Sequence, residues 1–306
     1  MKTLLATDGS PEATMALRAA SRFLRKSRNE FSVVCAAPEP MVQTATKAVK
    51  RDGKRLGEAY RKRIARETES ILSVARDVLA TEGVEAKAIT QFGSPSGVIL
   101  SMTEDYDVTV VGATGRKDQF LVGIGPVAGR VVEHGAGTVL VVREPSTDGS
   151  WRALVAVDGS RASQAAVNAL KMYFDIGGAE ITLMHVVETP WIHLGLNPEW
   201  LDYPNELLDR VDPEIQLEFE LGREAEIVVE RAEVQLEDYT LGLKSVIREG
   251  NPATEILGEA ELGDYDLIVL GATGVSDLKH QMLGSVSAKV AAQARCSVAV
   301  VKIREQ

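Results

Sequence analysis

The chain contains the same sequence pattern twice. The first forty positions of the two copies align without a gap, so that Leu4–Ser10 lies over Leu154–Ser160. The register shifts by nine residues in the middle and then returns, with Asp105–Gly115 over Asp264–Gly274. This period is far longer than that of a solenoid repeat, so each copy is expected to form a whole domain.

The domain boundary is expected near residue 150. A chain of 306 residues suits two domains of roughly 150 residues each. Between the copies lies Arg143–Ser150, a polar and turn-forming run typical of a linker. We therefore predict one domain over residues 1–144 and a second over 151–306.

Within each copy, short apolar runs alternate with amphipathic helical stretches. In the second copy we expect strands near 152–157, 180–187, 241–249, 266–271 and 297–302, and helices near 161–176, 213–238, 252–262 and 285–294. Strands such as Leu267–Leu270 are apolar throughout, as strands covered on both faces are. The alternation predicts an α/β fold of two tandem Rossmann-like domains, each a five-stranded parallel sheet flanked by helices.

Ligands of such sheets bind beyond the carboxyl ends of the strands, where the strand order reverses. This rule directs attention to the loops that follow Val157, Val187 and Leu270. The loop after Leu270 carries the sharpest chemical pattern of the chain.

That pattern is a glycine- and serine-rich loop. It reads Gly271-Ala272-Thr273-Gly274, then nine residues, then Gly284-Ser285-Val286-Ser287. Glycine lets the main chain approach a ligand, and a helix starting at Ser285 would direct free N–H groups and its positive dipole end into the loop. Such a loop suits a phosphate, although it lacks the lysine of a Walker loop. A plain strand–turn–helix connection with a serine cap explains the same residues, and both interpretations stay open.

The composition argues against several other classes of protein. Residues 1–150 hold 21 Lys and Arg against 18 Asp and Glu, whereas the remainder holds 13 against 26, so the second half carries the acidic charge. An acidic chain is a poor non-specific binder of nucleic acid.

No apolar run reaches the roughly 20 residues that cross a bilayer, and the early Asp8 leaves no room for a signal-peptide core. Cys35 and Cys296 lie in apolar strand-like runs and are expected to be buried thiols, so a cytoplasmic location is expected.

Further motifs accompany the spacing of the Gly271–Ser287 loop. They are an Asp that ends the first strand, a Leu-Met-His-Val-Val second strand at 183–187, a Gly-x-Pro before the third helix and a Cys-Ser-Val-Ala-Val-Val fifth strand at 296–301. With this set of motifs, both copies resemble the universal stress protein family. The resemblance covers almost the whole chain twice over, which is similar to the tandem-domain type. It implies an adenine nucleotide alpha hydrolase-like fold and a regulatory protein of the stress response.

Carried over position by position, the resemblance implies ATP, or AMP or ADP, in the second domain, with Mg²⁺ bound through the phosphates. The phosphates and ribose would be held by Gly271, Gly274, Gly284, Ser285 and Val286, with Ser287 as a further hydroxyl donor. The adenine or ribose would face Asp158 and the backbone around Ala156, Val157 and Val187.

The residue chemistry agrees on Asp158. A carboxylate repels phosphate, so it is better placed against ribose hydroxyls, the adenine amine or a bound Mg²⁺. Asp158-Gly159-Ser160 is also expected to turn the chain and cap the next helix. His185 resembles the strand histidine of many family members and is expected to be structural.

The glycine loop is broken in the first copy. Gly112, Gly115 and Gly125 keep the spacing, but Pro126 stands at the position of the serine and Ala128 at that of the second serine. Proline has neither a backbone N–H nor a hydroxyl, yet it is well tolerated in the first turn of a helix. We expect the first domain to fold normally and to bind nucleotide weakly or not at all.

Catalytic residues are not predicted. The sequence shows no nucleophile–base pair, metal cluster or carboxylate dyad, so ATP hydrolysis is expected to be slow or absent. Two alternatives stay open. One is an enzyme related to adenylating enzymes or electron-transfer flavoproteins, whose extra catalytic or flavin-contacting segments are not found. The other is a scaffold with a vestigial nucleotide site, in which the aromatic segment Thr189–Pro204 binds an apolar ligand or a protein.

Two features bear on association. The last strands, Thr138–Val142 and Ser297–Val301, are expected at sheet edges, which invite pairing. In the family that edge is the dimer contact, so the two domains are expected to pair internally as a pseudo-dimer, and a homodimer of whole chains stays open.

The segment from Lys47 to Arg66 is basic and that from Glu199 to Glu226 is acidic. These are either solvated helix faces or surfaces that meet.

Overall fold

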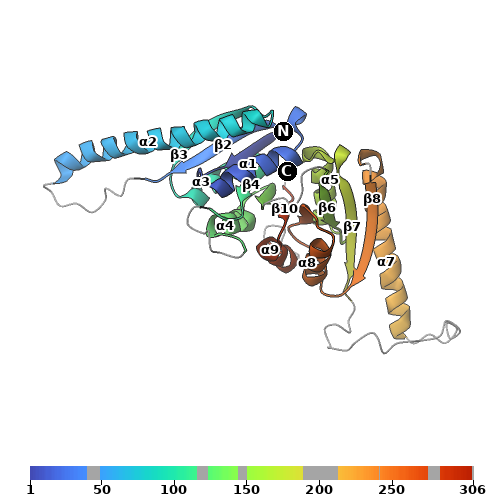
Figure 1. The fold of residues 1–306 in the computed structure, drawn as a ribbon. Helices are drawn as coiled ribbons and strands as arrows, with labels where there is room; N and C mark the ends of the chain where they lie inside the picture. The colour runs from blue at the N-terminus through green and yellow to red at the C-terminus, as the bar shows by residue number, and fades with distance from the viewer. Residues whose placement is uncertain are drawn as a thin grey trace. The chain divides into compact units, whose positions relative to one another are not determined.

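The computed structural model describes residues 1–39, 49–115, 123–143, 150–188, 213–240, 242–274 and 283–304. They form two compact units (Figure 1). Unit 1 consists of Met1–Pro145 together with Tyr173–Asp175 and Arg304–Gln306. Unit 2 consists of Ser146–Met172 and Ile176–Ile303.

Unit 1 is an open parallel sheet with helices on both faces. Its elements are β1 (Lys2–Ala6), α1 (Pro11–Phe23), β2 (Glu30–Ala37), α2 (Val49–Thr81), β3 (Ala86–Phe92), α3 (Pro95–Met102), β4 (Val108–Gly112), α4 (Pro126–His134) and β5 (Thr138–Val142). The strand order is β3-β2-β1-β4-β5 and every described pairing is parallel. Right-handed connections place α1 and α2 on one face and α3 and α4 on the other (Figure 1).

Unit 2 repeats this arrangement. Its elements are β6 (Arg152–Ala156), α5 (Arg161–Tyr173), β7 (Glu180–Val187), α7 (Pro213–Leu236), β8 (Gly242–Glu249), α8 (Pro252–Leu262), β9 (Leu267–Gly271), α9 (Ser285–Gln293) and β10 (Ser297–Val301). The strands run in the order β8-β7-β6-β9-β10, again all parallel. The predicted fold of two five-stranded α/β domains is confirmed. The helix predicted at 161–176 ends earlier, at Tyr173, because a 3₁₀ turn occupies Ile176–Gly178.

The turn after the first strand is built alike in both units. The Ser10 hydroxyl accepts from the Ala13 N–H at 3.1 Å, and the Ser160 hydroxyl accepts from the Ser163 N–H at 3.1 Å, so each serine caps the helix that follows. The preceding glycines, Gly9 and Gly159, have φ of 74° and 76°, a conformation that other residues rarely adopt. The predicted cap before residue 161 is therefore confirmed.

The two cysteines differ in their surroundings. Cys35 is buried in β2, as predicted, and neither cysteine forms a disulfide. Cys296 is only half-buried, so the prediction of a buried strand residue is wrong there. It lies in the bend between α9 and β10, one residue before the strand begins.

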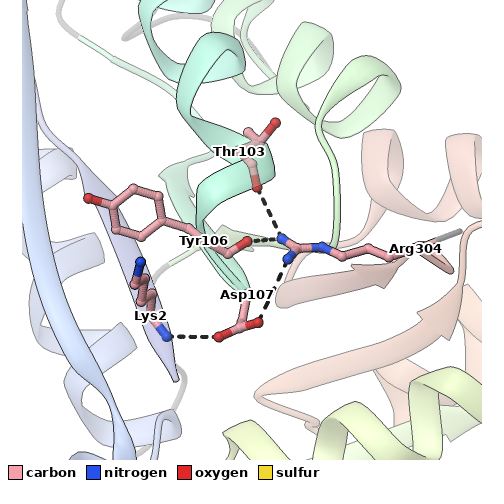
Figure 2. Close-up of polar contacts among 5 residues, drawn as sticks. All are labelled: Lys2, Thr103, Tyr106, Asp107 and Arg304. Carbon is pink, nitrogen blue, oxygen red and sulfur yellow. Dashed lines mark hydrogen bonds and ion pairs between the residues drawn. The ribbon is translucent and has the colours of Figure 1, made fainter. Parts of the chain in front are cut away.

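An aspartate ties the fourth strand to the first in each unit. The Asp107 carboxylate accepts from the Lys2 N–H at 2.8 Å, and the Asp266 carboxylate accepts from the Arg152 N–H at 2.9 Å. In unit 1 the aspartate has a second partner, Arg304, whose guanidinium lies 3.8 Å from Asp107 Oδ1 (Figure 2).

Arg304 is held by more than this ion pair. Its Nη2 donates to the carbonyl oxygens of Thr103, at 3.1 Å, and of Tyr106 (Figure 2). Gly137, with a φ of 66°, leaves room for the group, since a Cβ there would lie 2.8 Å from Nη2. The guanidinium thus occupies a niche made of backbone oxygens and one carboxylate.

We expect Arg304→Ala to destabilise unit 1 by about 1 kcal/mol, because it removes hydrogen bonds to a charged donor that is partly screened by water. Hydrogen-exchange mass spectrometry should show faster exchange in peptides that cover Thr103–Gly112. Arg304→Lys keeps the charge without the planar fork and should give an intermediate effect. Unchanged exchange in both variants would show that the niche adds no stability.

Several predicted features fall outside the described residues. These are the linker residues 144–149, the aromatic segment Thr189–Pro204, the first two residues of the basic segment (47–48) and the first half of the acidic segment (199–212). In the part of the chain that is described, no helix combines the length and apolar character that crossing a bilayer requires.

Candidate functional site

A cavity of about 470 Å³ opens at the carboxyl ends of β6, β7 and β9 in unit 2. β6 lies between β7 and β9, and the chain reverses its strand order at the β6–β9 pair. The cavity therefore lies at the switch point where parallel sheets bind ligands.

The residues predicted to bind nucleotide come together here. All ten line the cavity: Ala156, Val157, Asp158, Val187, Gly271, Gly274, Gly284, Ser285, Val286 and Ser287. They come from three separate loops, which the parallel topology brings to one edge of the sheet. The predicted residues therefore form one cavity because of the way the chain folds, although they lie far apart in the sequence.

The start of α9 offers hydrogen-bond donors to this cavity. Gly284 is the N-cap, and the first helical hydrogen bond runs from the Ala288 N–H to the Gly284 carbonyl at 2.9 Å. The N–H groups of Ser285, Val286 and Ser287 come before that bond and have no acceptor within the described part of the chain. Three unpaired N–H groups at the positive end of a helix make a favourable place for an anion.

The Ser287 hydroxyl has a different role from the predicted one. It is buried and donates to the Ala272 carbonyl at 2.6 Å, with the Gly284 carbonyl at 3.0 Å. Because a hydroxyl carries one proton, this group holds the two ends of the loop together instead of donating to a ligand. The backbone N–H of the same residue stays available.

We expect Ser287→Ala to lower the stability of unit 2 by about 1 kcal/mol, the usual value of one buried hydrogen bond. The loss is limited because the Ala272 carbonyl also accepts from the Gly284 N–H at 2.7 Å. A urea titration followed by tryptophan fluorescence would measure it. A stability loss above about 3 kcal/mol would instead mean that the loop collapses without this tether.

Asp158 both turns the chain and faces the glycine loop. Its Oδ1 accepts from the Ser160 N–H at 2.9 Å, as the turn prediction requires. Its Oδ2 lies near Gly274, where a Cβ would be 3.1 Å from it. Gly274 thus lets the loop come close to the carboxylate, which stands at the cavity wall.

His185 ties β7 to the end of β6. Its Nδ1 lies 2.7 Å from the Val157 carbonyl oxygen. The carbonyl can only accept, so Nδ1 carries the proton in this contact. The expected structural role is consistent with this bond, and the ring also borders the cavity.

The sequence did not reveal that α7 forms one wall of the cavity. Leu221, Glu224 and Val228 line it from positions i, i+3 and i+7, which share one helix face. Val228 packs on the turn after β6, since a Cβ at Gly159 would lie 3.0 Å from Val228 Cγ2. Apolar residues at helical spacing predict a buried helix face, but they do not distinguish a sheet from a cavity as its neighbour.

Comparison with known proteins agrees with the repeat. The model of the universal stress protein family matches residues 1–143 and, separately, residues 151–302. The chain belongs to the universal stress protein family.

Single-domain relatives match one copy at a time. Universal stress protein YxiE of Bacillus subtilis is 30% identical over 149 residues, which is 49% of this chain and 97% of the relative. Universal stress protein MJ0577 of Methanocaldococcus jannaschii is 29% identical over 160 residues, 49% of this chain and 93% of the relative. A universal stress protein structure from Archaeoglobus fulgidus covers 98% of this chain and 96% of its own, with a TM-score of 0.62 and 18% identity, which supports the fold across both units.

Unit 1 of this universal stress protein departs from unit 2 in the glycine loop and in the helix that follows the first strand. Helix α4 begins with Pro126 after the Gly125 N-cap, so the N–H that Ser285 supplies is missing. Glu12 occupies the position of Ala162, and its Oε2 is buried without a hydrogen-bond partner among the described residues. Unit 1 thus lacks both the N–H and the hydroxyl that Ser285 supplies in unit 2.

Proposed function

We propose that unit 2 binds an adenine nucleotide, ATP or its AMP and ADP relatives, and that the protein acts as a nucleotide-dependent regulator of the stress response. The observation that carries the proposal is the cavity itself. Three unpaired N–H groups at the start of α9, the Asp158 carboxylate and the carboxyl end of β7 all border it.

Each part of the cavity suits a different part of the ligand. The N–H groups of Ser285, Val286 and Ser287 and the Ser285 hydroxyl would hold phosphate oxygens. Asp158 would accept from ribose hydroxyls, and the backbone around Val187 would meet the edge of the adenine. Mg²⁺ would be bound through the phosphates, since it keeps most of its water ligands in such sites.

The cavity favours binding over turnover. The titratable side chains among its described lining residues are Asp158, His185, Glu188 and Glu224, and the Nδ1 of His185 is occupied by the Val157 carbonyl. No serine or threonine hydroxyl and no cysteine thiol hydrogen-bonds to one of these side chains in the described contacts. Without a positioned base, hydrolysis of bound ATP is expected to be slow or absent.

Calorimetric titration of the full chain with Mg·ATP would test the proposal. We expect one nucleotide per chain, bound in unit 2, because Pro126 removes the N–H and the hydroxyl of the serine from the equivalent loop of unit 1. Two nucleotides bound with equal affinity would contradict the assignment to unit 2. Native mass spectrometry of the protein as purified provides an independent test, since a retained adenine nucleotide adds its own mass to the chain.

A scaffold with a vestigial nucleotide site is the second candidate. It is favoured by the apolar residues that α7 and the strands bring to the cavity, among them Leu221, Val228 and Met184. The same mass spectrum separates the two candidates. A retained apolar molecule, together with no heat on addition of Mg·ATP, would favour the scaffold.

A further inference from the structure

Unit 1 includes two short segments that come from the second copy of the repeat. The first is Tyr173–Asp175, at the end of α5, and the second begins with Arg304, after β10. The residues next to them in the sequence, Met172, Ile176 and Ile303, belong to unit 2. The chain therefore passes from unit 2 into unit 1 at the end of α5, and again after Ile303.

The first segment is built into unit 1 by its backbone and by one aromatic side chain. Phe174 forms an antiparallel bridge with Leu24, and the two residues are 0% and 1% exposed. Backbone hydrogen bonds of 2.9 Å and 2.8 Å flank the bridge, from the Arg25 N–H to the Tyr173 carbonyl and from the Asp175 N–H to the Phe23 carbonyl. A fully buried phenylalanine is among the side chains whose loss weakens a core most.

The second segment fills the guanidinium niche of unit 1, where Arg304 meets backbone oxygens and Asp107 (Figure 2). When the two copies are aligned, Arg304 corresponds to Pro145 and Gly137 corresponds to Cys296. Since a Cβ at Gly137 would lie 2.8 Å from Arg304 Nη2, a cysteine at that position would leave no room for the guanidinium. The arginine and the glycine that makes room for it are thus both specific to the niche of unit 1.

The two segments lie near one another at Asp107. Burial raises the pKa of the Tyr173 phenol, the Asp107 carboxylate raises it further, and the Arg304 guanidinium lowers it. The Tyr173 ring is therefore within electrostatic reach of both charged groups. Asp107 also accepts from the Lys2 N–H of β1, at 2.8 Å, so this carboxylate connects the sheet of unit 1 to the surroundings of both segments.

The other end of α5 is packed equally closely in unit 2. A Cβ on Gly271 of β9 would lie 2.6 Å from the Ala162 carbonyl carbon, and Ser163 lines the cavity. A helix of 13 residues is about 20 Å long. Helix α5 thus has its first turn fixed in unit 2 and its last residue, Tyr173, in unit 1.

We propose that Tyr173–Asp175 and Arg304 form a joint that makes the two units unfold together. Unit 1 keeps Phe174 and Arg304 in place only while α5 and β10 are folded, because segments attached to an unfolded chain lose conformational entropy when they bind. By linkage, a ligand that stabilises unit 2 then stabilises unit 1 as well. For a nucleotide in the cavity, this last consequence rests on the proposed function.

Hydrogen-exchange mass spectrometry of the full chain tests the joint without a ligand. Gly271→Ala perturbs unit 2, and exchange in β7 and β2, which hold the same place in the two copies, reports the opening of unit 2 and of unit 1. We expect Gly271→Ala to speed exchange in both strands by about tenfold.

Loss of the joint should remove this response from unit 1. In the double variant F174A/R304A, exchange in β2 should be faster from the start, and the addition of Gly271→Ala should speed it no further. Arg304→Ala alone is the milder change, and it should reduce the response of β2 to Gly271→Ala without abolishing it. The response of β7 should stay the same in all of these chains.

Two matched controls separate the joint from a general loss of stability. Leu72→Ala truncates a buried residue of α2 that belongs to neither segment, and β2 should still respond to Gly271→Ala in that chain. Arg295→Ala removes an exposed arginine that pairs with Glu261 at 2.6 Å, and it should leave the response unchanged.

The inference is overturned if Gly271→Ala leaves exchange in β2 unchanged in the otherwise unaltered chain. An undiminished response in F174A/R304A, or an equal loss of response in Leu72→Ala, overturns it as well. None of these outcomes bears on the proposed function, because no nucleotide is present in the experiment.

Discussion

Replacement of Ser285 by proline is expected to weaken the binding of Mg·ATP at least about tenfold, with unit 2 still folded. The substitution removes one backbone N–H and one hydroxyl from the start of α9, and a hydrogen bond to a charged group is worth about 1.5–3 kcal/mol. Since 1.4 kcal/mol is a factor of ten in affinity, the loss of one such bond is enough. The helix itself should tolerate the change, because proline is favoured in the first turn.

Unit 1 provides the precedent and the control for this variant. Helix α4 begins with Pro126 and keeps the same length of nine residues as α9. Ser285→Ala removes the hydroxyl but keeps the N–H, so it should lose less affinity than the proline variant. Calorimetry measures both, and a circular dichroism melt checks the fold. An unaltered affinity in S285P would mean that α9 does not hold the phosphates.

Most helix and strand bounds could be predicted because the caps and the apolar spacing that indicate them lie within or next to each element. Helix α8 has the predicted bounds, since the Asn251 side chain accepts from the Thr254 N–H at 3.2 Å and Pro252 occupies the first turn. Helix α5 was predicted too long because Ile176 continues the apolar spacing. Ile176 is indeed buried, but a 3₁₀ turn and not the helix places it there. Apolar spacing reports that a residue is buried and does not report which backbone conformation buries it.

The part of the site that its loops form could be predicted from the sequence. The Gly271–Ser287 loop and Asp158 follow strands whose order the repeat and the right-handed connections determine, so their meeting follows from topology. The α7 wall has no such signal, because the contact of Glu224 with the cavity depends on where a helix lies over the sheet. The bond from Ser287 to the Ala272 carbonyl depends on the tertiary geometry of the loop in the same way.

Replacement of Gly271 by alanine is expected to have the largest effect on stability. A Cβ at this position would lie 2.6 Å from the carbonyl carbon and 2.8 Å from the carbonyl oxygen of Ala162. Those atoms belong to the first turn of α5 and cannot rotate away as a side chain would. Overpacking of this kind costs about 1–3 kcal/mol, and the midpoint of thermal unfolding should fall by roughly 2–12 °C.

The repeat supplies a matched control at Gly112. There the nearest atoms to a new Cβ are the Thr114 carbonyl oxygen at 3.2 Å and the Ala16 Cβ at 3.7 Å, so Gly112→Ala should cost less. Tryptophan fluorescence follows the second half of the chain, because Trp151, Trp191 and Trp200 all lie in it. Circular dichroism follows the whole chain for the control. If both alanine variants lower the midpoint of thermal unfolding equally, the close approach of β9 to α5 does not explain the loss of stability. The need for glycine would then come from the loop conformation that the two units share.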